Sequence, residues 1–219
     1  LVKSKKLINN QEILLNAIRQ SYQQSLTGYK KPKIISIALS GGCDSMVLLH
    51  AINELRDELN IIVKAIHIHH GISPNADKWE SFCRSECEKF KAIFSIKKIN
   101  IHQERHLGVE GAARKLRYEA LDELRDGVLA TAHHQNDQAE TLFLQLIRGS
   151  GLKGLASMPH YDERRDIWRP LLNVNRTAIV EYAKLNQISF IEDESNLDTR
   201  FDRNFLRQEI FPLLSERFP

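Results

Sequence analysis

Short apolar runs that alternate with helical stretches are the feature that most constrains the fold of this chain. Five runs have the composition of buried strands: 34–39, 61–68, 93–101, 128–132 and 188–191. Stretches with helical periodicity separate them, at 46–59, 76–91, 110–125, 136–148 and 175–186. This alternation predicts an α/β fold, a Rossmann-like parallel five-stranded sheet with helices on both faces.

Two regions lie outside this alternation. An amphipathic stretch from 8 to 26 precedes Gly28, which predicts a leading helical segment over 1–28 and a main domain over 29–219. Between 148 and 172 the periodicity fails, and several glycines and prolines predict a long loop with a short edge strand at 166–168. Long loops inside a compact domain often carry function.

Composition excludes some classes of protein and leaves others open. The chain has 219 residues, 42% of them hydrophobic, enough for one substantial core. It has no apolar stretch of about 18 residues and no signal-like N-terminus, so we expect a soluble, cytoplasmic protein without a membrane partner. The net charge of +3 permits RNA as a partner without requiring it. The oligomeric state stays open, with a homodimer as one option.

The three cysteines do not form a recognisable framework. Cys43, Cys83 and Cys87 are an odd number, and the last two are four residues apart, unlike a C-x-x-C motif. A set of disulfides is therefore not expected. Zinc bound by Cys83, Cys87 and nearby histidines remains the minor alternative.

A glycine loop lies between the first apolar run and the following helix, Ser40-Gly41-Gly42-Cys43-Asp44-Ser45. Glycines allow the backbone amides to point outward, and the helix start behind them favours an anion, which predicts phosphate binding. The loop lacks the lysine of a Walker A motif and carries Asp44 instead. A carboxylate there suits phosphate if Mg²⁺ bridges the two. The alternative is an ordinary turn with serine caps.

Polar residues also follow the second and fourth apolar runs. In an open parallel sheet, ligands bind beyond the carboxyl ends of the strands, where His67, His69 and His70 stand, together with His133 and His134. Residues 67 and 69 share one side of a strand. We interpret these histidines as the lining of a nucleotide cleft, with metal ligation as the alternative.

Charged residues mark two further helix starts. Asp137 and Glu140 lie three residues apart in a first helical turn, after Asn136 as a good N-cap. They either complement the helix dipole or bind a cationic amine. Arg114 belongs to a basic block that is either a solvated face or a phosphate contact. Further on, Arg203 and the arginine four residues later share one helix face, with nearby acids as ordinary partners.

These motifs together resemble one group of enzymes. The glycine loop resembles the signature loop of the N-type ATP pyrophosphatases, the PP-loop family with the adenine nucleotide alpha hydrolase-like fold. Within that family, the order and spacing of the other motifs are similar to those of the tRNA(Ile)-lysidine synthetases. The motifs that carry this resemblance are His70-Gly71, 110–118, 133–141, 148–151, 169–172 and 192–204.

The resemblance implies an activity. ATP activates the C2 carbonyl of the wobble cytidine in tRNA(Ile) with a CAU anticodon, and the ε-amine of L-lysine then displaces AMP to give lysidine. It also implies roles for residues of this chain. The loop residues Ser40, Gly41, Gly42, Cys43, Asp44 and Ser45 bind ATP, with His67, Arg114 and His133 along the nucleotide. Asp44 holds Mg²⁺, Asp137, Glu140 and Arg203 bind lysine, and Asp44, Asp137 and Arg203 are catalytic.

The chain also departs from that pattern. Many members have aspartate where this chain has Asn136, so a metal role for that position is in doubt. The family's C-terminal tRNA-binding domains are absent from these 219 residues. Two other functions stay open: another PP-loop enzyme acting on tRNA, or a non-catalytic nucleotide-binding module. A thiolase with disulfide chemistry needs paired cysteines near the cleft, where the sequence places only Cys43.

Overall fold

The structure is a computed structural model that describes residues 2–26, 32–71, 73–100, 108–193 and 198–218. In chain order, its helices and strands are α1 (Val2–Leu26), β1 (Ile34–Ala38), α2 (Cys43–Leu59), β2 (Ile62–His69), α3 (Ala76–Lys89), β3 (Ile93–Lys98), α4 (Gly108–Leu124), β4 (Val128–Ala130), α5 (Gln135–Ile147), α6 (Leu152–Leu155), β5 (Tyr161–Asp162), β6 (Ile167–Trp168), α7 (Arg176–Leu185), α8 (Asp202–Phe205), the π-helix η3 (Leu206–Ile210) and α9 (Phe211–Arg217).

The described strands form one six-stranded sheet in the order β3-β2-β1-β4-β6-β5. The first five of these strands run parallel, and β5 pairs with β6 in the antiparallel direction. The predicted parallel α/β sheet is confirmed. Because β1, β2 and β4 point the same way, the glycine loop and the histidines at the ends of β2 and β4 come to one edge of the sheet.

The identity of the fifth parallel strand was predicted wrongly. Residues 188–191 form no strand; instead Ile191 donates its backbone N–H to the carbonyl of Gly41 at 2.9 Å, so this segment closes over the glycine loop. The fifth parallel strand is β6, predicted as an edge strand but fully buried. A two-residue strand carries no periodicity, so its place inside the sheet, between β4 and β5, depends on long-range contacts such as the hydrogen bond from Trp168 Nε1 to Ser21 Oγ, 2.9 Å.

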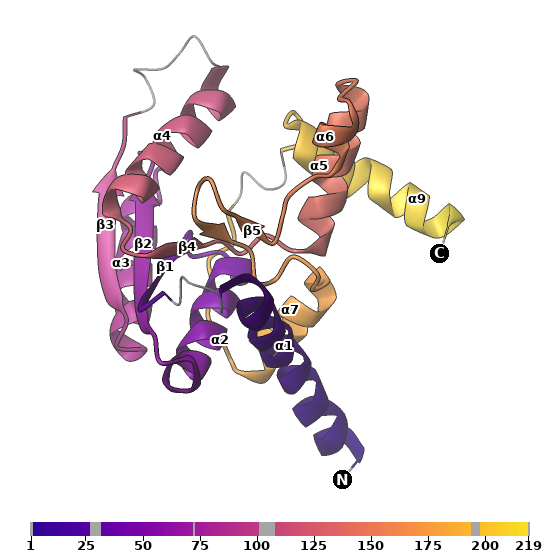
Figure 1. Ribbon diagram of the computed structural model, residues 1–219. Helices are drawn as coiled ribbons and strands as arrows, with labels where there is room; N and C mark the ends of the chain where they lie inside the picture. Colours follow the sequence, from indigo (N-terminus) through magenta and orange to yellow (C-terminus); the bar gives the residue numbers. More distant parts are fainter. Residues whose placement is uncertain (1, 27–31, 72, 101–107, 194–197, 219) are drawn as a thin grey trace.

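Helices cover both faces of the sheet, as predicted (Figure 1). On β2, Val63 and Ala65 pack into the core shared with α1, α2, α3 and α7. The alternate residues Ile66 and Ile68 pack with α4 into a second, smaller core. This alternation along one strand is the period-two pattern of a sheet buried on both sides.

The described part of α1 is built into the larger core. Leu14, Ile18 and Leu26 are at most 1% exposed, and Tyr22 meets Trp168 edge to face with ring centroids 5.8 Å apart. The division of the chain at residue 28 stays a prediction. None of the described helices is long and apolar enough to cross a membrane.

Helices α5, α6 and α9 form a separate group beyond the end of β4. Figure 1 shows α5, α6 and α9 gathered on the side of the molecule away from β3. Phe143 of α5 packs edge to face on Phe211 of α9, with ring centroids 5.2 Å apart. This contact holds the segment after α7 against α5, whose first turn lies at the same sheet edge as the glycine loop.

Candidate active site

The glycine loop opens directly onto the start of α2. Gly42 is the N-cap residue and no side chain caps the helix, so the amides of its first turn face outward. Inside the loop, Ser45 Oγ donates to the carbonyl of Gly42 at 3.0 Å and lies 3.0 Å from Ser40 Oγ. The two serines therefore brace the loop from within, and its helix start is suited to a phosphate group.

Close packing explains why the loop needs glycine at position 41. Gly41 has φ +90°, and a Cβ there would lie 2.7 Å from Ile191 Cδ1 and 3.1 Å from Cys83 Sγ. Two segments far apart in the sequence thus pack against the loop backbone. The sequence placed only Cys43 near the cleft, and the structure adds Cys83 beneath the loop.

Asp44 is the charged residue of this loop, which has no Walker A lysine. Its Oδ2 lies 3.7 Å from His134 Nε2 and its Oδ1 lies 3.9 Å from Arg176 Nε. Burial raises the pKa of Asp44, but His134, Arg176 and Arg207 outweigh burial and hold it below its usual value. Oδ1 is buried and makes no hydrogen bond within the described residues. An ionised carboxylate oxygen that accepts no hydrogen bond, beside a phosphate site, fits a divalent cation such as Mg²⁺.

The start of α5 differs from the prediction. His134, 1% exposed, is the N-cap residue, and its backbone N–H donates to Asp137 Oδ2 at 2.9 Å. Asn136, predicted as the N-cap, lies inside the helix, where its Oδ1 accepts from the backbone N–H of Arg176 at 3.2 Å. Asn136 therefore ties α5 to the start of α7, next to Asp44. Sequence reasoning missed His134 as the residue between Asp44 and Asp137.

The two carboxylates of α5 face a common cation. Arg207 places Nη2 2.6 Å and Nε 2.8 Å from Glu140 Oε1, and Nη2 also lies 3.5 Å from Asp137 Oδ1. Glu140 is fully buried, which raises its pKa despite Arg207. We expected nearby acids as the partners of Arg207, but Glu140 lies 67 residues away in sequence.

Arg203 and His133 border the same carboxylates. Arg203 Nη2 donates to Thr141 Oγ1 at 3.3 Å, one residue after Glu140. His133 Nδ1 lies 2.8 Å from Thr131 Oγ1. Burial lowers the pKa of His133 to about 4 against the opposing effect of Asp137, so its ring is neutral at pH 7. The structure thus brings together Asp44, Asp137, Glu140, Arg203 and His133 from four elements or their ends.

The histidines of β2 have different surroundings. His67 is 4% exposed and its Nδ1 lies 2.9 Å from the carbonyl of Leu39, directly before the glycine loop. Burial lowers the pKa of His67. His69 instead pairs with Asp77 on α3 at 3.1 Å and, with Glu80, forms the metal-compatible group found within the described residues. Lys98 already reaches Asp77 at 3.2 Å, so a cationic side chain occupies that group.

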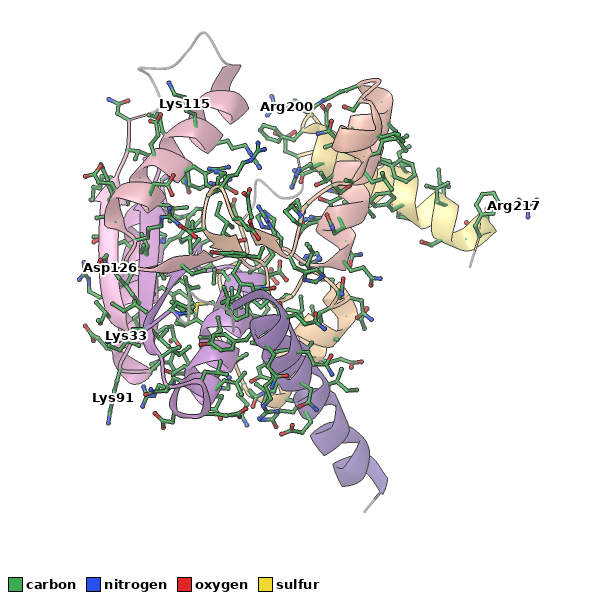
Figure 2. All side chains as sticks on the ribbon, viewed as in Figure 1. Lys33, Lys91, Lys115, Asp126, Arg200 and Arg217 are labelled. Carbon is green, nitrogen blue, oxygen red and sulfur yellow. The ribbon has the colours of Figure 1, made fainter. Side chains whose placement is uncertain are left out.

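Basic residues lie around the same end of the molecule. Arg114 is exposed on α4, its guanidinium 5.4 Å from the ring centroid of Tyr118, and Arg165 lies over that ring at 4.2 Å. Figure 2 shows Lys115 of α4 at the same end as Arg200, with Lys91 at the opposite end. Together with burial, the positive charge of Arg114 lowers the pKa of His133.

Family comparison agrees with this geometry. Residues 12–214 match the PP-loop domain family. The chain belongs to the PP-loop family. This membership supports ATP as the nucleotide of the glycine loop, now identified as a PP-loop.

Curated relatives of this PP-loop chain are named tRNA(Ile)-lysidine synthase. The protein of Actinobacillus pleuropneumoniae serotype 3 (strain JL03) is 47% identical over 186 residues, 83% of this chain and 43% of its own length. That of Haemophilus ducreyi is 44% identical over 204 residues, 90% of this chain and 46% of its own. The chain therefore spans less than half the length of these relatives.

Solved structures show the same PP-loop fold at low sequence identity. A tRNA thiolase from Methanococcus maripaludis superposes with a TM-score of 0.72 and 19% identity, covering 95% of this chain and 75% of that chain. The NMN synthetase of Francisella tularensis has a TM-score of 0.55 and 14% identity, with coverages of 92% and 86%. These likenesses support the fold and leave the reaction to the site residues.

Proposed function

We propose that this chain is the catalytic domain of a tRNA(Ile)-lysidine synthase, which uses ATP to join L-lysine to the wobble cytidine of tRNA(Ile) with a CAU anticodon. The observation that carries the proposal is the joining of the PP-loop to a carboxylate pair through His134, which lies 3.7 Å from Asp44 and 3.5 Å from Asp137. The names of the relatives agree with it.

The first half of the proposed reaction occurs at the PP-loop. The free amides at the start of α2 bind the β- and γ-phosphates, and His67 and Arg114 lie along the nucleotide. Mg²⁺ held by Asp44 would neutralise charge on the pyrophosphate that leaves. The C2 oxygen of the cytidine attacks the α-phosphorus, the bond to pyrophosphate breaks, and the base becomes an adenylate.

The second half uses the carboxylates of α5. Asp137 and Glu140 bind the side-chain ammonium group of lysine, and Arg203 binds its carboxylate. Asp137, whose side chain is 13% exposed against 1% for Glu140, accepts the proton that frees the amine. The amine nitrogen then bonds to C2 while the C2–O bond breaks and AMP leaves.

Several parts of the proposal concern partners. The tRNA is held partly by exposed basic residues such as Arg114, Lys115 and Arg164. Lys153 is a further candidate from the sequence, and its side chain lies outside the described residues. We further propose a cytoplasmic location and allow a homodimer. The remaining length of the relatives is where additional tRNA contacts would lie.

A thiolase is the second candidate, because the tRNA thiolase from Methanococcus maripaludis has the same fold as this chain. The cysteines argue against it. Burial raises the pKa of Cys43 to about 11, and burial with neighbouring acids raises those of Cys83 and Cys87 to about 12. Thiols with such pKa values have almost no thiolate at pH 7 and are poor nucleophiles.

One experiment tests the proposal. The chain is incubated with tRNA(Ile) transcript, ATP, Mg²⁺ and L-lysine, AMP is quantified, and the tRNA is digested for mass spectrometry. We expect cytidine converted to lysidine, with AMP release that requires lysine and tRNA together. A transcript with a CAC anticodon is the matched control. Sulfur incorporation would favour the thiolase, and nucleotide binding without AMP release would favour the non-catalytic module.

A further inference from the structure

We propose that Arg207 is a positioning residue of the lysine subsite: it keeps Glu140 ionised and leaves the second oxygen of that carboxylate free for the ammonium group of the substrate. This inference rests on the proposed function. Arg207 would then support lysine binding from the side of the site opposite to the substrate, without touching the reacting atoms.

The geometry of the contact is that of a fixed ion pair. Two nitrogens of one guanidinium, Nε and Nη2, approach a single oxygen of Glu140, Oε1, at 2.8 and 2.6 Å. The side chain of Glu140 is 1% exposed and that of Arg207 is 33% exposed. Arg207 therefore covers the buried carboxylate from the solvent side, and its planar fork limits the rotation of Glu140.

The other oxygen of Glu140 has no partner. Oε2 is buried and makes no hydrogen bond within the described residues. An unpaired buried carboxylate oxygen is costly, so the site fits a further donor. Asp137 is arranged alike: Oδ2 caps α5 through the amide of His134, and Oδ1 is turned toward Arg207 at 3.5 Å. The two carboxylates and Arg207 leave one net negative charge, which matches one ammonium group.

The charges around Glu140 explain why Arg207 is needed. Burial raises the pKa of Glu140 and Asp137 raises it further, while Arg207 and Arg203 lower it. His134 lies beyond Asp137 on the α5 side. Without Arg207, burial and the like charge of Asp137 act against Arg203 alone, and Arg203 donates to Thr141. The pKa of Glu140 would then rise further, which favours its protonated form, and a neutral carboxyl group binds an ammonium group poorly.

The backbone holds Arg207 in this place. It lies in the π-helix η3, whose first residue, Leu206, is 3% exposed and anchors the turn. A π-helical turn is wider than an α-helical one and often marks a functional position. The aromatic contact between Phe143 and Phe211 fixes the next helix on α5. Both sides of the ion pair are therefore held by independent packing.

A simpler role for Arg207 makes the opposite prediction. If its guanidinium merely filled the ammonium site and had to leave before lysine entered, removing it would strengthen lysine binding. If Arg207 only stabilised the fold, lysine affinity would not acquire a new pH dependence. The sign and the pH profile of the effect therefore separate positioning from competition and from a structural role.

The test measures L-lysine binding by calorimetry, with an ATP analogue present, for the wild-type chain, Arg207→Met, Arg207→Lys and the control Arg200→Met. Arg200 has a side chain that is 88% exposed and pairs with Asp198. At pH 8 we expect Arg207→Met to weaken lysine binding by about tenfold or more, and by a further factor of about ten at pH 6. Arg207→Lys should recover part of the affinity, and Arg200→Met all of it.

A second measurement is independent of lysine. Infrared difference spectra of the unliganded protein at pH 7 should show a protonated carboxyl band in Arg207→Met that disappears when Glu140→Gln is added. Lysine binding as tight as wild type, a pH profile parallel to wild type, or no such band would each overturn the inference while leaving the proposed function intact. If the wild-type chain neither binds lysine nor releases AMP with it, the proposed function fails.

Discussion

Replacement of Gly41 by alanine tests whether the PP-loop is held by packing from distant segments. The added Cβ meets two obstacles: a backbone with φ +90°, and Ile191 Cδ1 at 2.7 Å. The left-handed backbone costs about 1–2 kcal/mol for a residue with a side chain, and crowding in a packed region costs about 1–3 kcal/mol more. Gly41→Ala should therefore lower the free energy of unfolding by about 2–5 kcal/mol.

Gly71→Ala is the matched control, because it separates the cost of the left-handed backbone from the cost of crowding. Gly71 also has a positive φ, +68°, but no atom of the described residues lies within 4 Å of its Cβ position. Gly71→Ala should therefore lower the free energy of unfolding only by the cost of the left-handed backbone, about 1–2 kcal/mol. The difference of about 1–3 kcal/mol between the variants corresponds to about 2–12 °C in Tm for a chain of this size. Calorimetry of both variants measures that difference directly.

The double variant Gly41→Ala/Ile191→Ala identifies the contact. Removal of Ile191 Cδ1 relieves the crowding, so the two substitutions should destabilise by less than the sum of their separate effects. ATP affinity should fall in Gly41→Ala and recover in part in the double variant, because the loop amides return toward their places. Equal Tm values for the Gly41 and Gly71 variants, or strict additivity in the double variant, would refute the packing argument.

Four further outcomes are expected. Asp44→Ala should abolish AMP formation yet shift Tm by only a few degrees, since the side chain loses only the long contacts to His134 and Arg176, at 3.7 and 3.9 Å; retained activity in the AMP assay would remove the metal role. Asp137→Asn and Glu140→Gln should raise the KM for lysine by about a decade or more while the KM for ATP moves little, because truncating a buried charge pair costs about 2–5 kcal/mol; steady-state kinetics with unchanged lysine KM would return both carboxylates to helix capping. The affinity for tRNA should fall as salt rises, with a slope of log affinity against log salt concentration of about 0.7–0.9 per phosphate contact. Arg114→Ala should reduce that slope in filter-binding titrations, and a slope near zero would contradict phosphate contacts. Cys43 should resist iodoacetamide at pH 8 in the folded protein, because burial raises its pKa to about 11; rapid labelling seen by mass spectrometry would reopen thiol chemistry.

Local patterns in the sequence predicted most of the elements. Every helix predicted after the glycine loop starts and ends within three residues of an observed helix, since periodicity of 3.6 and capping act within one turn. The first four strands were predicted because each is a short, continuous apolar run, which is a local signal as well. The place of the PP-loop and of Asp137 at one sheet edge followed as well, because parallel strands bring their carboxyl ends together. The roles of the site residues stay predictions.

Tertiary structure alone decided which distant residues meet. The sequence could not show that Ile167 and Trp168, and not 188–191, form the fifth parallel strand, because two residues have no measurable period and their burial depends on α1 through Ser21. The sequence predicted that Arg207 lies on a helix face with nearby acids as partners. In the folded chain it pairs instead with Glu140, 67 residues away in sequence. What the sequence determined rests on hydrogen bonds and side-chain spacing within single helices and strands. What only the fold decided rests on packing between segments, where burial and charge depend on neighbours that sequence order does not reveal.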